Sequence, residues 1–216
     1  MSVGANVAQN EETVTEPAPR TRMRAFERRA LITAAALESF ASRGYHATSL
    51  GEIAKAAGVA RTVMYDHFPS KKVLLLAVMH EQNAALIEYV GARMSGAGDA
   101  RGRMRATVEA YFSFAKSKPA ARRVLFDPVS DDDPEIQTVR QGIRDARTRA
   151  VIALLSQDMR QIGVDPAEPG AEAMVEFIIT GLDGVAQWWE RRPEVPSSTL
   201  VEGVMWLLWS GLSPRS

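Results

Sequence analysis

Apolar residues recur at helical spacing along almost the whole chain, and no segment shows the strict alternation expected of a strand. The helical pattern begins near Met23, and stretches rich in glycine, proline and serine interrupt it. The pattern therefore predicts an all-α fold with about nine helices. These helices are expected at about residues 23–43, 49–57, 61–68, 71–94, 101–116, 119–126, 134–162, 171–191 and 197–211.

The composition excludes several classes of function. The 216 residues include no cysteine and only three histidines, which excludes disulfides and cysteine-ligated metals and argues against a histidine-rich metal centre. Because no nucleophile–base pair or glycine-rich phosphate loop is present, we predict neither catalysis nor a cofactor. No apolar run approaches the ~18 residues of a membrane span, and no signal peptide is recognisable. We therefore expect a cytoplasmic protein with no membrane partner.

Charge is unevenly distributed along the chain, although its formal net value is zero. Residues 1–19 carry a net charge of −3, residues 20–72 carry +6, and residues 73–216 carry −3. The first 20 residues are polar and lack periodicity, so we interpret them as a disordered tail. A basic segment on an otherwise acidic chain favours a polyanionic partner for that segment alone. We accordingly divide the rest of the chain into domains at residues 21–70 and 71–216.

The stretch Thr48–Phe68 carries the most specific motif, a pair of short helices joined at Gly58. A glycine is expected in this turn because the backbone there requires a positive φ. Small and apolar residues are spaced so that one helix locks against the other. These residues are Ile53, Ala54, Ala57, Val59 and Met64. The arrangement is that of a helix-turn-helix, whose second helix enters the major groove of DNA.

From about Phe26 to Ile87, the chain resembles the N-terminal domain of the tetracycline-repressor (TetR) family of bacterial transcriptional regulators. The residues that carry the resemblance are Ile32, Ala35, Ala36, Phe40, Gly44, Tyr45, Ala47, Thr48, Ile53, Ala54, Ala57, Gly58, Val59, Tyr65, His67, Phe68, Ser70 and Lys71. The resemblance implies a three-helix DNA-binding domain, followed by a larger helical domain for ligand binding and dimerisation. The chain departs from the family pattern at Ala60, where the family usually has a serine or threonine cap. It departs again at Asp66, whose negative charge is repelled by phosphates.

The spacing within the second helix separates an inner face from an outer face. Met64 and Phe68 are one turn apart and are expected to face the core, which leaves Arg61, Thr62 and Tyr65 outward. Arg61 is our candidate for reading guanine, and Thr62 and Val63 are candidates for contacting a thymine methyl group. Each of these side chains also fits an ordinary surface or packing role.

Other candidate contacts go to the DNA backbone. By resemblance, Tyr65, His67 and Lys71 contact phosphates. Thr48 and Ser49 begin the first helix of the motif, where free N–H groups attract anions. A basic arm provides a further candidate, either as a DNA contact or as a disordered flank. It consists of Arg20, Arg22 and Arg24.

Residues 71–216 are expected to provide the dimer interface, because one such module buries little DNA surface. All four tryptophans lie in the last two predicted helices, beside glycines that allow close helix packing. The candidate interface residues are Leu182, Val185, Trp188, Trp189, Val201, Met205, Trp206 and Trp209. Alternatively, the tryptophans fill the core of the subunit.

The middle helices are expected to enclose a pocket for a small-molecule effector. Methionines and aromatic residues are adaptable wall residues, although they also suit an ordinary core. The candidates are Met79, Met94, Met104, Tyr111, Phe112, Phe114, Phe126 and Met159. We interpret Arg122–Arg123 and the row Arg140, Arg144 and Arg147 as solvated helix faces. The acidic run 131–133 fits a loop, with Asp133 capping a helix that begins at Pro134.

These features predict a homodimeric, sequence-specific regulator of transcription that binds an operator in double-stranded DNA. The resemblance to the family implies a repressor that is released from DNA by its ligand. We expect the bound ligand to tilt the helix that begins at Lys71. One alternative is an all-α enzyme or small-molecule carrier with an incidental basic segment. Another is a DNA-binding regulator that docks a protein and senses no ligand.

Overall fold

The computed structural model describes residues 25–94, 98–127 and 133–212, with side chains as far as residue 209. Within these ranges it contains nine helices and no strand, which confirms the predicted fold class. The helices are α1 (Ala25–Arg43), α2 (Leu50–Ala56), α3 (Arg61–His67), α4 (Lys71–Met94), α5 (Ala100–Ser117), α6 (Pro119–Phe126), α7 (Pro134–Gln161), α8 (Pro169–Glu190) and α9 (Ser197–Leu212). The predicted tail 1–20 and the arginines of the predicted arm lie outside the described residues.

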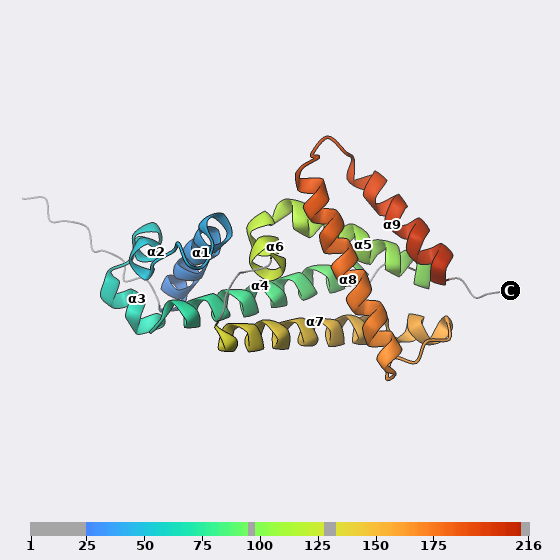
Figure 1. The fold of residues 1–216 in the computed structure, drawn as a ribbon, viewed down its shortest axis with the longest axis horizontal. Coiled ribbons are helices and arrows are strands. Elements are labelled where there is room, and N and C mark those ends of the chain that lie inside the picture. The colour runs from blue at the N-terminus through green and yellow to red at the C-terminus, as the bar shows by residue number, and fades with distance from the viewer. Residues whose placement is uncertain (1–24, 95–97, 128–132, 213–216) are drawn as a thin grey trace, which may run out of the picture.

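The helices form a small head and a larger body (Figure 1). Helices α1, α2 and α3 lie together at one end of the molecule, and α4 runs from this head along the body. Helix α7 packs against α4, while α5, α6, α8 and α9 complete the body. This arrangement agrees with the predicted three-helix N-terminal domain and larger helical C-terminal domain.

The apolar core consists of two clusters, and α4 contributes to both. The head cluster packs Ile32 and Phe40 of α1 against Ile53, Met64 and the first half of α4. It also takes in side chains from the body, namely Val124 of α6 and Ile136 and Ile143 of α7. The body cluster combines the second half of α4 with α5–α9. The domain boundary at residue 70 remains a prediction, since α4 belongs to both cores.

A charged contact fastens the start of α4 to the start of α7. The Lys72 ammonium lies 3.3 Å from the Asp133 carboxylate and also contacts Glu135. Asp133 caps α7 as predicted, because its Oδ1 accepts from the backbone N–H groups of Glu135 (2.9 Å) and Ile136 (3.4 Å). Although partial burial opposes ionisation, these hydrogen bonds and Lys72 hold the pKa of Asp133 below its ordinary value.

The burial of Arg122 contradicts the prediction that Arg122 and Arg123 both lie on a solvated helix face. Arg122 is only 1% exposed, whereas Arg123 is exposed. The Arg122 guanidinium donates to three carboxylates, those of Asp127 (2.9 Å), Asp183 (3.0 Å) and Glu190 (3.0 Å). Burial disfavours its charge, yet these partners raise its pKa above the ordinary value. Arg122 therefore joins α6 to α8 inside the body.

Candidate nucleic-acid interface

The first helix of the motif is capped at both ends by its own sequence. At its start, the Ser49 hydroxyl accepts from the Glu52 N–H (3.3 Å), and the Glu52 carboxylate accepts from the Ser49 N–H (2.9 Å). At its end, the Val59 N–H donates to the Ala54 carbonyl (3.0 Å), and the Gly58 N–H donates to the Lys55 carbonyl (3.2 Å). This Schellman pattern requires a left-handed residue after the helix, which Gly58 supplies with a φ of +66°.

The second helix of the motif is α3, and its inner face is fixed by burial. Met64 is fully buried, and Phe68, just after the helix, is 1% exposed, as predicted. The start of α3 is uncapped, because the side chain of Ala60 cannot accept a hydrogen bond. The helix is therefore held by packing against α1, α2 and α4 rather than by a cap.

The outer face of α3 presents the predicted reading residues to solvent. Arg61 and Thr62 are exposed, and Tyr65 is 51% exposed. No hydrogen bond or ion pair joins Arg61 to another of the described residues, so its donors are available to a ligand. Its guanidinium lies across Gly51 of α2, where an added Cβ would come within 2.8 Å of an Arg61 nitrogen. Our sequence reasoning missed this role of Gly51, although a glycine inside a short helix was a signal for it.

The structure corrects the expectation for Thr48. The N–H of Thr48, which was expected to attract phosphate, donates to the Tyr45 carbonyl (3.3 Å). The Thr48 side chain is 2% exposed, and its hydroxyl donates to the backbone carbonyls of Gly44 (2.8 Å) and Ser39 (3.3 Å). Thr48 therefore closes the turn between α1 and α2 and cannot offer its hydroxyl to phosphate. Ser49 is exposed, but its N–H and hydroxyl both donate to Glu52.

The other residues that were predicted to contact the DNA backbone differ in the exposure of their side chains. Val63 and His67 are partly buried. The Lys71 ammonium donates to the carbonyls of Tyr45 (2.8 Å) and His46 (3.4 Å) and lies 4.3 Å from the centre of the Tyr45 ring. Lys71 thus fastens the α1–α2 turn to the start of α4, and a phosphate contact would be additional to that role.

In the body, the predicted pocket residues divide into two groups. An apolar cavity of about 60 Å³ lies between α4, α5, α7 and α8, and Met104, Tyr111 and Phe126 are among its wall residues. Met79 instead borders an adjoining polar groove. The other candidates, Met94, Phe112, Phe114 and Met159, are buried in the body core and do not line the cavity.

The cavity has a charged wall residue that our sequence reasoning placed on a solvated face. Arg147 lines both the cavity and the groove and is only 6% exposed. Its guanidinium lies 4.3 Å from the centre of the Phe126 ring, and no hydrogen bond or ion pair joins it to another described residue. Its Nε is buried without a partner, and burial lowers the pKa of the group. Arg147 is therefore a buried cation with no hydrogen-bonded or ion-paired anion among the described residues, although the Glu176 and Asp183 carboxylates favour its charge from farther away.

The predicted dimer residues also divide, into buried and exposed side chains. Leu182, Trp189, Val201 and Met205 are buried within the subunit, and Val185 and Trp209 are partly buried. Trp188 and Trp206 are exposed, by 38% and 73%. Two apolar residues outside the predicted set are also exposed, Phe177 (66%) on α8 and Leu207 (57%) on α9.

None of the helices in the described parts of the chain is both long enough and apolar enough to cross a membrane.

Comparison with known proteins agrees with the motif. Residues 32–78 match the bacterial regulatory proteins of the tetR family. Over 187 residues the chain is 33% identical to the HTH-type transcriptional activator FasR of Mycolicibacterium smegmatis, which covers 87% of this chain and 84% of that protein. The chain belongs to the TetR family. The resemblance seen in the sequence is thereby confirmed, and this TetR-family protein is a DNA-binding transcriptional regulator.

Two further comparisons extend the similarity to the body. The chain is 30% identical over 184 residues to the HTH-type transcriptional regulator TtgR of Pseudomonas putida, which covers 81% of this chain and 86% of that protein. Its fold is similar to that of FadR from Bacillus subtilis, solved in complex with stearoyl-CoA, with a TM-score of 0.72. That pair shares 21% identity and covers 84% of this chain and 98% of the other.

Proposed function

We propose that α3 reads an operator in double-stranded DNA through Arg61, Thr62 and Tyr65. The supporting observation is that these side chains are exposed on one face, while the opposite face of α3 is buried. Arg61 is placed to contact a guanine edge, since its guanidinium has no partner in the described residues. Tyr65, Ser49, His67 and Lys71 are proposed to contact phosphates and set the register.

Replacing Arg61 and Tyr65 together by alanine tests this assignment. Loss of one good base contact is worth about 1–3 kcal/mol, or roughly 5–150-fold in affinity. The measurement is operator affinity by fluorescence anisotropy at several salt concentrations, with circular dichroism to check folding. Asp66→Ala on the same helix is the matched control and is expected to bind at least as tightly. If the double variant binds the operator as tightly as the parent, the assignment is wrong.

We propose further that the exposed apolar face of α8 and α9 forms the interface of a homodimer. Phe177, Trp188, Trp206 and Leu207 supply the apolar surface that would be buried. On the same two helices, an added Cβ at Gly181, Gly184 or Gly203 would meet nothing within 4 Å, which leaves room for a partner helix. The two-fold pairing would place two α3 helices on successive major grooves.

Sedimentation of a Trp206→Glu variant tests the interface, since a charge there would have to be desolvated on pairing. The variant is expected to be monomeric at micromolar concentration. The control is Leu31→Glu, because Leu31 is an exposed leucine on α1, outside the proposed face. Dimers of unchanged stability in the Trp206 variant would exclude this face.

For the effector, we propose an amphiphile with an apolar chain and an acidic or anionic group. The apolar cavity between α4, α5, α7 and α8 would receive the chain, and Arg147 at its wall would meet the anion. The stearoyl-CoA bound to the similarly folded FadR is a ligand of this chemistry. Typical ligand pockets measure about 300–1,000 Å³, so a cavity of about 60 Å³ must enlarge to admit such a chain. Such an enlargement would displace α4 and α7, and this displacement would couple ligand binding to the position of the head.

The sign of regulation is proposed to be repression, relieved when the effector binds. The relative FasR is described as an activator, so a transcriptional reporter provides the decisive test. Deleting the gene for a repressor raises transcription from the operator-bearing promoter. A fall in transcription would show an activator, and operator affinity that is identical with and without stearoyl-CoA would exclude that compound as the effector.

A further inference from the structure

The space that a side chain at position 51 would fill is occupied by the Arg61 guanidinium. A Cβ built on Gly51 would lie 2.8 Å from Nη2, 3.2 Å from Nε and 3.4 Å from Cζ of Arg61. Three atoms of one planar group therefore lie against the backbone of α2, although Arg61 is the first residue of α3. The guanidinium can take this position because residue 51 has no Cβ. We term this contact between Gly51 and Arg61 the arginine seat.

Backbone conformation does not account for the glycine at position 51. Gly51 lies within α2 and has an ordinary helical backbone, in which glycine is less stable than alanine. Other helical glycines have open space around them, so that an added Cβ would meet nothing within 4 Å. These are Gly142, Gly181, Gly184 and Gly203. The contact with Arg61 is therefore what distinguishes Gly51, and it gives a reason for glycine where alanine would favour the helix.

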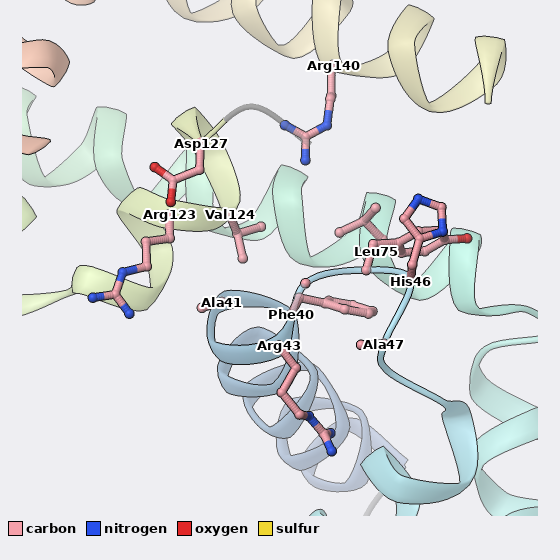
Figure 2. Close-up of a pocket in the computed structure, with 12 residues that line it drawn as sticks. Phe40, Ala41, Arg43, His46, Ala47, Leu75, Arg123, Val124, Asp127 and Arg140 are labelled. Atoms are coloured by element: carbon pink, nitrogen blue, oxygen red, sulfur yellow. The ribbon is translucent and has the colours of Figure 1, made fainter. Parts of the chain in front are cut away.

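Both helices that form the arginine seat are fixed within the head. Ile53 of α2 and Met64 of α3 are fully buried in the head cluster. Figure 2 shows the Arg43 side chain projecting from the end of α1, and its guanidinium lies 3.3 Å from the carboxylate of Glu52, the residue after Gly51. The backbone at Gly51 is therefore held in a constant position relative to the start of α3, which makes the seat a rigid support.

The arginine seat leaves the hydrogen-bond donors of Arg61 available to DNA. No hydrogen bond or ion pair joins Arg61 to another described residue, so α2 supports the guanidinium through contact alone. An arginine side chain loses conformational entropy when it is ordered by binding, and one that is already restricted loses less. A restricted guanidinium also presents its donors in a narrow range of directions, which favours one base edge over the others.

We propose that Gly51 is a positioning residue, which holds the Arg61 guanidinium in the place from which it reads one base pair of the operator. This inference rests on the reading role proposed for Arg61. A side chain at position 51 would displace the guanidinium from α2 while Arg61 itself remained. The displaced arginine would then point in several directions, so the protein would discriminate less between bases at that position.

Heteronuclear NMR of the full-length protein without DNA tests the arginine seat directly. The Arg61 Nε–Hε signal is assigned by its loss in Arg61→Ala, and its order parameter reports how far the side chain moves. We expect Arg61 to be more ordered than Arg149, an exposed arginine on α7. Gly51→Leu is expected to lower the order parameter of Arg61 and leave that of Arg149 unchanged. If Arg61 moves as freely in the parent as in Gly51→Leu, the seat does not restrict it and the proposal is wrong.

Base preference tests the positioning role. The probes are the duplex that the full-length parent selects from a random pool and each single-base-pair variant of that duplex. Arg61→Ala is expected to abolish discrimination at the base pair that Arg61 reads. Gly51→Leu is expected to lower discrimination at the same base pair about three- to tenfold, which is roughly what ordering one long side chain contributes. Gly51→Ala should have a smaller effect in the same direction, because the guanidinium has to shift less to clear a methyl group.

Two controls separate positioning from other effects of the substitution. Combining Gly51→Leu with Arg61→Ala should give the same affinities as Arg61→Ala alone. A further loss in the combined variant, equal to that in the parent background, would mean that the leucine clashes with DNA itself, and the positioning role would be wrong. Gly142→Ala, at an exposed position on α7 where an added Cβ meets nothing within 4 Å, should leave base preference unchanged.

Failure of the proposed function and failure of the arginine seat give different results. If Arg61→Ala changes no base preference, the reading role of Arg61 is wrong and the role of Gly51 is wrong with it. If Arg61→Ala does change it, while Gly51→Leu keeps the parent's preference or weakens every duplex equally, the reading role stands and the positioning role is wrong.

Discussion

The head and the body use arginine in opposite ways. In the head, Arg61 is exposed and has no ion-pair or hydrogen-bond partner among the described residues, and the surface around it is proposed to meet a polyanion. In the body, Arg122 is buried and donates to three carboxylates. Arg147 follows neither pattern, because it is buried yet makes no hydrogen bond or ion pair with a carboxylate of the described residues. An arginine therefore indicates a binding site when it is buried without a paired carboxylate, or exposed on a surface that lacks one.

The greatest loss of stability is predicted for the arginine that is fully paired. Arg122→Met leaves Asp127, Asp183 and Glu190 without their shared cation, and breaking such a buried pair typically costs about 3–5 kcal/mol. Because the carboxylates reach solvent in part, we expect the lower end of this range. Urea unfolding measures it, with Arg123→Met as the exposed neighbouring control, expected to change stability by less than about 0.5 kcal/mol. Equal losses of stability in the two variants would show that the buried, paired Arg122 contributes no more than the exposed Arg123.

The same substitution at the unpartnered arginine should have the opposite sign. Arg147→Met removes a desolvated charge and gives up its contact with the Phe126 ring, so we expect stability to rise by about 1 kcal/mol. The same unfolding experiment measures it. A loss comparable to that of Arg122→Met would mean that Arg147 is paired, and the proposed anion site in the cavity would then lose its support.

A smaller stabilising effect is expected in the head, at the start of α3. Ala60→Ser supplies the missing cap, and a good cap contributes about 0.5–2 kcal/mol relative to alanine. We expect about 0.5 kcal/mol, because α3 is already held by packing. Thermal unfolding measures the change, and Ala56→Ser, an exposed position on α2, controls for the effect of a hydroxyl. A drop in melting temperature would show that the uncapped start has another structural role.

The smallest effect concerns pH and the contact between the start of α4 and the start of α7. The folded pKa of Asp133 lies below its ordinary 3.8. Its contribution is therefore present above pH 3.8 and is lost as pH falls through the folded value. The folded pKa of Lys72 lies above its ordinary 10.5, so its contribution is lost only above that pH.

Comparing the melting temperature of Lys72→Met with that of the parent tests this contact. The difference between them should be constant from pH 5 to 9 and shrink below pH 3.8. A difference that changes near neutral pH would implicate another group.

Much of the fold follows from local sequence patterns, as the helix-turn-helix illustrates. Gly58, the buried pair Met64 and Phe68, and the uncapped Ala60 were all predicted from spacing and residue type, and the structure confirms each. The bounds of α4 were also predicted, because Pro69 and the SGAGDA stretch mark its ends in the sequence.

The burial of Thr48, Arg122 and Arg147 could not be predicted in the same way. Their burial depends on other segments of the chain, such as Asp183, which meets Arg122 from 61 residues away. Helical periodicity gives the face of a residue on its own helix but not what packs over that face. For the same reason, the tryptophans of α8 and α9 could not be divided between core and surface from the sequence.

The shared role of α4 limits how this regulator can be recombined with others. Leu74, Leu75 and Val78 lie in the first half of α4 and belong to the head cluster, together with Ile136 and Ile143 of α7. A chimera that joins this head to a foreign effector domain at Pro69 would leave Phe40 and Met64 facing mismatched neighbours. Exchange of the proposed operator specificity is therefore better attempted by transplanting the outer face of α3 alone, since its exposed side chains are part of neither core.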